Sequence, residues 1–336
     1  MEKPGGYESN LSHRGEIYRR GGVEYYDKIA RQTAQEDPER AAFLRDLVHT
    51  FEPEKIKDIF LEYLDKSGVP VDRANVGFLD NILFRPEGPD TGLYRAIFNK
   101  MIFSTEGKYL NEVFERYKLE MGIPRDVFMR VQLDFVHEIA HALSFIRMTS
   151  KDANNTRTIL DTEVGYARGR YDIRQPSRPE KSPAEKEVKR DFEALNEGVT
   201  ERIAREIYIE YIKRSGIPFG SEFTRAFAEE QASARYTAYM HQIDCICERI
   251  GEHGGIPKGQ VWNGIKRGYF ENPQMLHEET QETFEQVFGP DFLRDYGALG
   301  NTSSPEEMLT FISKYGFEFY PQLFKEKLLE DLGVKN

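Results

Sequence analysis

The stretch DFVHEIAHALSF, from Asp134 to Phe145, contains the residue types that zinc chemistry requires. His137 and His141 are four positions apart, and Glu138 directly follows the first histidine. Each helical residue advances by about 100°, so both imidazoles project from one face of a helix, one turn apart. Two such imidazoles can bind one zinc ion at about 2.0–2.1 Å, with Glu138 beside it to take a proton from water. The spacing therefore predicts a catalytic zinc site.

The same letters also fit an ordinary amphipathic helix that carries two histidines by chance. The chain has 7 histidines in 336 residues, and a chance match of this motif is expected in roughly one such chain in a hundred. An apolar stripe at helical spacing would bury this helix, and it consists of Val131, Phe135, Ile139 and Leu143. A zinc hydrolase also needs a third protein ligand, so the rest of the chain must supply one.

The segment Phe192–Ile207 offers that ligand. Its apolar positions predict a helix, on whose other side Glu197 and Glu201 lie four residues apart among small residues such as Ala194 and Gly198. We expect Glu197 to reach the metal and Glu201 to accept the free N–H of a ligand histidine. A glycine inside a helix costs about 0.5–1 kcal/mol relative to alanine, so Gly198 indicates a close helix approach or a functional constraint. The alternative is a solvated face with ordinary surface glutamates.

Together these residues resemble the gluzincin metallopeptidases, the thermolysin-like branch of the zincins. The resemblance rests on HEIAHALS, a following Gly-Tyr pair and ALNEGVTERIA, and it covers about residues 76–268, strongly over the two metal helices and faintly elsewhere. It implies that His137, His141 and Glu197 bind Zn²⁺, that Glu138 is the catalytic base, and that Glu201 supports a ligand. It also places GLYRAIFNKMIFS, residues 92–104, where the family has the edge strand of its sheet.

The resemblance further implies a tyrosine near the site at the start of a later helix, which YTAYMHQIDCICERIG approximates from Tyr236. Tyr239 and His241 lie in the same predicted helix and could serve instead. A donor at this position would stabilise the oxyanion that develops when water attacks a carbonyl carbon.

The expected fold class is α+β and predominantly helical: a zincin-like fold with a small mixed sheet packed on the HExxH helix, and a helical C-terminal subdomain. We expect a helical N-terminal extension over residues 1–52 and a metallopeptidase domain over 53–336, with an α/β part to about 180 and a helical part after it. The elements expected along the chain are a helix over Glu54–Lys66, strands within 74–84 and 92–104, a long helix over Arg125–Met148, a hairpin turning near Arg168–Gly169, and helices from Ala184 onward.

The net charge of −11 argues against general nucleic-acid binding and against coating of anionic membranes. The N-terminus lacks the apolar core of a signal peptide, and no window approaches 18 consecutive apolar residues, so we expect no membrane insertion. A cytoplasmic location is expected, and delivery by a route without a signal stays open.

The leading hypothesis is a zinc endopeptidase of gluzincin type that acts on a protein or peptide substrate. One alternative is a zinc hydrolase of a non-peptide amide. Another is a non-catalytic helical interaction protein with a degenerate motif. Bound zinc would separate the first two hypotheses from the third.

Overall fold

The computed structural model describes residues 7–69, 82–85, 92–95, 100–104, 108–120, 125–154, 157–174, 184–215, 221–233, 235–271, 278–300 and 303–334. Within these residues the fold is α+β and predominantly helical, with a small mixed five-stranded sheet, which confirms the predicted class at this level. The strands of this sheet are β1 (Tyr7–Asn10), β5 (Ile146–Asn154), β6 (Arg157–Val164), β7 (Ala167–Arg174) and β8 (Ala184–Asp191). No helix among the described residues is both long and apolar enough to cross a membrane.

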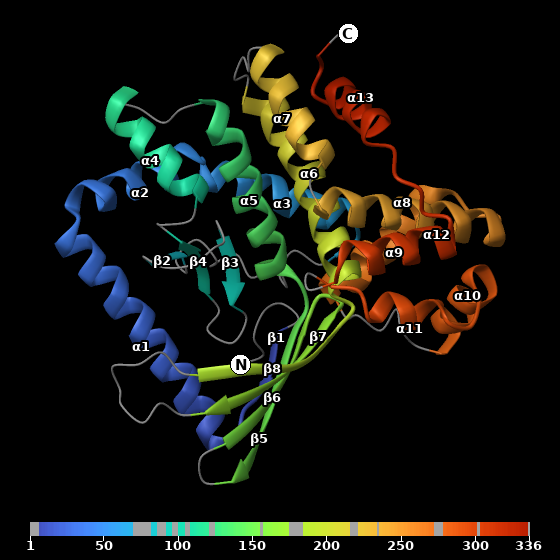
Figure 1. Ribbon diagram of the computed structural model, residues 1–336, viewed down its shortest axis with the longest axis horizontal. Helices are drawn as coiled ribbons and strands as arrows, with labels where there is room; N and C mark the ends of the chain where they lie inside the picture. The colour runs from blue at the N-terminus through green and yellow to red at the C-terminus, as the bar shows by residue number, and fades with distance from the viewer. Residues whose placement is uncertain are drawn as a thin grey trace.

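The first half of the chain forms helices, most of which lie on one side of the molecule, and a second, three-stranded sheet (Figure 1). The helices are α1 (His13–Glu36), α2 (Pro38–Thr50), α3 (Pro53–Lys66), α4 (Lys108–Glu120) and α5 (Arg125–Leu143). The sheet has the order β2 (Ile82–Arg85), β4 (Lys100–Ser104), β3 (Gly92–Arg95), so that β3 is an edge strand. Both β3 and β4 pack against α5.

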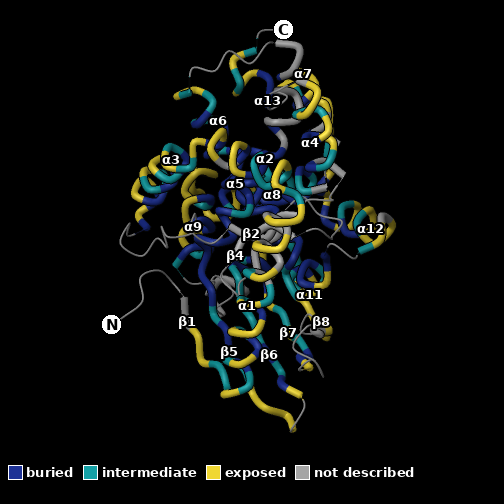
Figure 2. The backbone as a smooth tube through the Cα atoms, turned by 90° about the vertical axis from the view of Figure 1, so that its left-hand side faces the viewer, coloured by how far each residue is buried: buried dark blue, intermediate teal, exposed yellow. Residues whose placement is uncertain are grey.

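The second half of the chain is largely helical and packs on the other side of α5 (Figure 1). Its helices are α6 (Glu193–Ser215), α7 (Ser221–Ser233), α8 (Arg235–Gly254), α9 (Lys258–Glu271), α10 (Glu278–Phe288), α11 (Phe292–Gly297), α12 (Pro305–Tyr315) and α13 (Pro321–Asp331). Figure 2 shows that the buried segments gather around α5, whereas the far ends of the strands are exposed.

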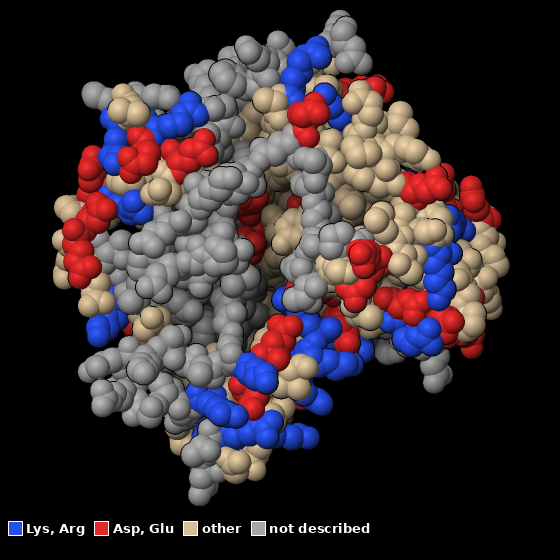
Figure 3. All heavy atoms as spheres, in the orientation of Figure 1, with Lys and Arg blue, Asp and Glu red and all other residues tan. Residues whose placement is uncertain are grey.

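The sheet strands β1 and β5 are parallel, and β5 to β8 form an antiparallel meander. Figure 3 shows that positive and negative side chains are interspersed over this meander. Several are paired across neighbouring strands, as in Arg147–Glu163 and Arg170–Asp161. Such exposed pairs contribute little stability, typically below about 1 kcal/mol each. They mark this part of the sheet as solvated surface.

The N-terminal residues take part in the main body of the fold. Strand β1 pairs with β5, and Tyr18, Phe43 and Phe51 belong to the same hydrophobic core as the α5 stripe. Phe51 stacks on Phe135 with ring centroids 4.7 Å apart. The division into an extension over 1–52 and a domain over 53–336 stays a prediction.

Several predicted elements are confirmed. Helix α3 begins one residue before the predicted Glu54 and ends at Lys66, with Gly68 in the left-handed region at φ 74°. The apolar face predicted for it is fully buried: Ile56, Ile59, Phe60 and Leu64. The α5 stripe of Val131, Phe135, Ile139 and Leu143 is buried as well. Of the strands predicted within 74–84, residues 74–81 lie outside the described part.

Three boundaries were predicted wrongly. The helix expected to reach Met148 ends at Leu143, because Ile146 and Met148 alternate with less buried residues and form a strand. The hairpin turns at Gly165–Tyr166 rather than Arg168–Gly169, since Gly165 has a φ of 55° that glycine adopts without strain. The segment expected to be helical from Ala184 first forms β8, whose backbone pairs with β7, and α6 begins only at Glu193.

The predicted segment over 92–104 also differs from a single strand. It contains β3 and β4, which pair antiparallel with Leu93 opposite Ile102. Because β4 is parallel to β2 on its other side, this sheet is mixed too.

Gly198 lies at a close approach of α6 to α8. A Cβ at this position would lie 2.6 Å from the backbone oxygen of Tyr239, closer than real Cβ contacts allow. The predicted close helix approach is therefore confirmed, although the neighbour is α8 and not the histidine helix. This contact sets the distance between the metal-facing side of α6 and the first turns of α8.

We expect Gly198→Ala to destabilise the protein by about 1–3 kcal/mol, because the methyl group meets backbone atoms that cannot rotate away. Thermal or urea unfolding followed by circular dichroism measures this change. Gly264→Ala in α9 is the matched control, since its Cβ would meet nothing within 4 Å among the described residues. Equal stability of the Gly198→Ala variant and the wild type would contradict the close packing.

Candidate metal centre

Two packed helices supply the candidate metal ligands. Helix α5 carries His137 and His141 one turn apart near its C-terminal end, and α6 carries Glu197 in its second turn. The two helices pack against each other, so the carboxylate faces both imidazoles. All three side chains are buried, at 4%, 8% and 5% exposure respectively.

The three ligand atoms lie at the separations that a tetrahedral metal requires. His137 Nε2 is 3.1 Å from His141 Nε2 and 3.2 Å from Glu197 Oε2, and His141 Nε2 is 3.4 Å from that oxygen. Zinc bonds of 2.0–2.1 Å at tetrahedral angles would place ligand atoms about 3.3–3.4 Å apart. A His-His-Glu donor set suits zinc and leaves one position open. This group could therefore hold a metal ion.

Glu201 fixes the orientation of His137. The Nδ1–H of His137 donates to Glu201 Oε2 at 2.9 Å, which leaves Nε2 on the side that faces Glu197 and His141. A carboxylate on the far nitrogen of a ligand histidine sets its tautomer and raises its basicity. Glu201 thus occupies the place that the sequence predicted for it.

His141 is oriented by residues that the sequence did not single out. Its Nδ1 lies 3.4 Å from Thr200 Oγ1 and 3.5 Å from both Asn196 Nδ2 and the Tyr269 hydroxyl. Thr200 donates to the carbonyl of Asn196 at 2.8 Å, so its oxygen is available to accept the Nδ1–H of His141. The arrangement leaves Nε2 of His141 for the metal, as on His137.

Asn196 and Thr200 could have been found from the sequence, whereas Tyr269 could not. The two residues precede Glu197 and Glu201 by one position each and share their spacing of four, so they lie on the adjacent face of α6. Tyr269 comes from α9, and no motif connects that helix to the site. Asn196 also accepts from the backbone N–H of Tyr166 at 2.9 Å, which ties the β6–β7 turn to α6.

The site brings together charges of opposite sign in a dry environment. Burial lowers the pKa of His137, but its hydrogen bonds to Glu197 and Glu201 outweigh burial and raise that pKa well above the usual value. Burial raises the pKa of Glu197, yet the two histidines lower it below the usual range. Both effects hold a proton on His137 and a negative charge on Glu197 at neutral pH. A metal ion would replace that proton.

Tyr236 lies against the metal group. Its ring stacks on His137, with centroids 5.2 Å apart and planes 13° from parallel, and it belongs to the first turn of α8. The nearby Glu197 carboxylate, followed by burial, raises the pKa of Tyr236 well above its usual value. The hydroxyl therefore stays protonated at neutral pH and can donate a hydrogen bond.

The two other candidates for this role face elsewhere. The Tyr239 hydroxyl donates to the carbonyl of Gly300 at 3.1 Å, and the side chain is fully buried between α8 and the 298–300 segment. His241 Nε2–H donates to the carbonyl of Glu318 at 2.7 Å, and its ring contacts Phe319. Of the three predicted alternatives, the structure brings only Tyr236 to His137.

Glu138 is half-buried and adjoins the metal group along α5. Its negative charge contributes to the raised pKa of Tyr236, after the larger effects of Glu197 and of burial. Glu138 directly follows the candidate ligand His137 in the sequence, and the candidate ligand atoms themselves come from other side chains.

No family model matches this chain, and neither a curated protein nor a solved structure is significantly similar to it.

Proposed function

We propose that this chain is a zinc-dependent metallopeptidase of gluzincin type, with a zincin-like fold around α5 and α6. The observation that carries the proposal is the set of three buried ligand atoms, 3.1–3.4 Å apart, supplied by His137, His141 and Glu197. A structural site would use all four positions of a tetrahedral metal for protein ligands, whereas three ligands are typical of catalytic zinc. The resemblance to gluzincins supports the same ligand set.

When bound here, zinc would lower the pKa of a water molecule to near 7 and polarise a carbonyl group. In this proposal Glu138 takes a proton from the attacking water and later delivers it to the leaving amine. Tyr236 donates a hydrogen bond from its hydroxyl to the oxygen that becomes negatively charged. The three candidate ligands are buried, so their charges interact in a lower dielectric than that of water.

The proposed substrate is a protein or peptide chain in extended form. Strand β3 is an edge strand and packs against α5, so a substrate backbone can pair with it beside the metal helix. An edge strand recognises the substrate main chain, which favours a peptide over a small amide without a repeating backbone.

The decisive experiment measures metal content and cleavage together. We expect purified protein to contain about one zinc ion per chain and to cleave members of a peptide library, detected by mass spectrometry. Removal of zinc with a chelator should abolish cleavage, and added zinc should restore it. Absence of bound metal after incubation with zinc would contradict the metal site, and bound zinc with no peptide cleavage would contradict the peptidase.

A further inference from the structure

Arg205 connects the carboxylate behind His137 to two other helices. It lies one turn after Glu201 on α6, and its Nε–H donates to Glu201 Oε1 at 2.6 Å. The other oxygen of the same carboxylate accepts from His137. Arg205 exposes only 5% of its surface, so this ion pair is shielded from solvent.

The other edge of the guanidinium is held by α7 and α8. Its Nη2 donates to Gln231 Oε1 at 2.8 Å and to the hydroxyl of Thr237, and that hydroxyl in turn donates to the carbonyl of Gln231. Thr237 directly follows Tyr236, whose ring stacks on His137. Arg205 therefore contacts both Glu201, which accepts from His137, and Thr237, which adjoins the predicted oxyanion donor Tyr236.

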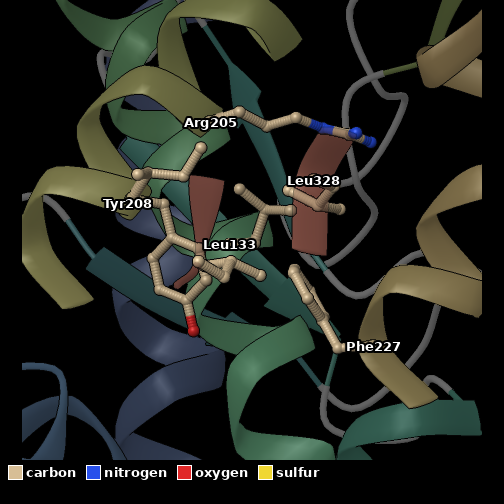
Figure 4. Close-up of a pocket in the computed structure, with 7 residues that line it drawn as sticks. Leu133, Arg205, Tyr208, Phe227 and Leu328 are labelled. Atoms are coloured by element: carbon tan, nitrogen blue, oxygen red, sulfur yellow. The ribbon is translucent and has the colours of Figure 1, made fainter. Parts of the chain in front are cut away.

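Apolar side chains complete the surroundings of Arg205. Its guanidinium carbon lies 4.8 Å from the ring centroid of Phe324 in α13. Beside it is a small cavity whose lining includes Leu133, Tyr208, Phe227 and Leu328, which Figure 4 shows grouped below the arginine. The apolar lining offers the guanidinium no other charge, so Glu201, Gln231 and Thr237 determine its orientation.

We propose that Arg205 is a positioning residue of the metal site. It fixes the Glu201 carboxylate against His137 and, through Thr237, fixes the first turn of α8 with Tyr236. The proposal rests on the proposed metal-dependent function, because it assigns Arg205 a role through ligands of that metal. Arginine suits the role because its planar fork donates in two directions at once, which lysine cannot do.

Arg202, one turn earlier on α6, provides a matched control. Its Nη1 lies 2.8 Å from Asp244, and its guanidinium carbon is 4.0 Å from the ring centroid of Trp262. It has the same charge and lies on the same helix, but its ion pairs are with Asp244 and Glu206, whereas Arg205 pairs with the Glu201 carboxylate behind His137. Replacing Arg202 tests the effect of losing a part-buried arginine as such.

The experiment compares Arg205→Met with Arg202→Met in zinc affinity, measured by chelator competition, and in the visible absorption of the cobalt-substituted protein. We expect Arg205→Met to weaken zinc binding about 10–100-fold, as is usual when a group behind a ligand is lost. Its cobalt spectrum should shift, because the orientation of His137 changes. Arg202→Met should bind zinc within about threefold of the wild type, well below the 10–100-fold loss expected for Arg205→Met, and should keep the wild-type spectrum. Equal behaviour of the two variants, or wild-type binding and spectrum in Arg205→Met, would overturn the proposal.

Arg205→Lys keeps the measurement informative if Arg205→Met does not fold. Lysine can contact Glu201 but cannot reach Gln231 and Thr237 at the same time, so we expect weakened binding of at most about tenfold and a shifted cobalt spectrum. An unchanged affinity and spectrum in this variant would overturn the role. Failure of the proposed function has a different signature and is seen in the wild type: absence of bound zinc or cobalt would contradict the metal site, and bound zinc without peptide cleavage would contradict the peptidase.

Discussion

Glu138→Gln is expected to abolish peptide hydrolysis while leaving zinc fully bound. The amide cannot accept the proton of the attacking water, so the rate should fall by at least the 10²–10⁴-fold that general base catalysis typically contributes. Zinc should remain because its three ligand atoms belong to His137, His141 and Glu197. Glutamine has nearly the shape of glutamate, so the packing of α5 should be unchanged. Metal analysis and a cleavage assay on the same preparation measure both results.

The control for this substitution is Glu248→Gln, which makes the same change at an exposed position of α8. It should retain wild-type cleavage and zinc content. Hydrolysis at the wild-type rate in Glu138→Gln would contradict the role of Glu138 as the base. Loss of zinc from that variant would instead indicate that Glu138 contributes to metal binding, which contradicts the ligand assignment.

Glu197→Gln is expected to reduce zinc affinity more than any other single carboxylate change. Glu197 is the proposed third ligand and the only carboxylate among the three, and its oxygen lies within 3.4 Å of both imidazole nitrogens. The neutral amide oxygen is a weaker zinc ligand and no longer balances the charge of the metal in a buried site. The loss of zinc affinity should exceed the 10–100-fold reduction that is typical when a group that only orients a ligand is removed.

Glu201→Gln supplies the comparison, because it removes a buried carboxylate of the same helix that contacts His137 from behind. The zinc affinity of Glu201→Gln should fall by an amount within that 10–100-fold range. Competition with a chromophoric chelator gives both affinities. A ranking in which Glu201→Gln weakens zinc more than Glu197→Gln would refute the assignment of Glu197 as the third ligand.

The ligand set could be predicted from the sequence because helical geometry is local. A spacing of four places His137 beside His141, and the same spacing places Glu197 beside Glu201. The apolar stripes then determine which faces of α5 and α6 turn inward. Only the meeting of the two helices is non-local, and it was inferred from the need for a third ligand. The small residue Gly198 packs against α8 instead.

Strand pairing was less predictable. The charged segment Ala184–Asp191 has no apolar alternation, and its strand conformation comes from pairing with β7. Tertiary pairing of this kind overrides local propensity. The contacts of Tyr269 and Arg205 were likewise hidden, because they depend on where α9, α7 and α8 pack. No local pattern encodes those positions.

The parallel pairing of β1 with β5 has a consequence for how the chain folds. Tyr7 is opposite Ile146, so the first strand cannot find its partner until the histidine helix and the strand after it exist. During synthesis the β1 segment must stay unpaired while more than a third of the chain emerges. Contacts between such distant residues slow folding, because the closure of a long loop comes before any gain from pairing. The completion of this five-stranded sheet is therefore expected to be a late step in folding.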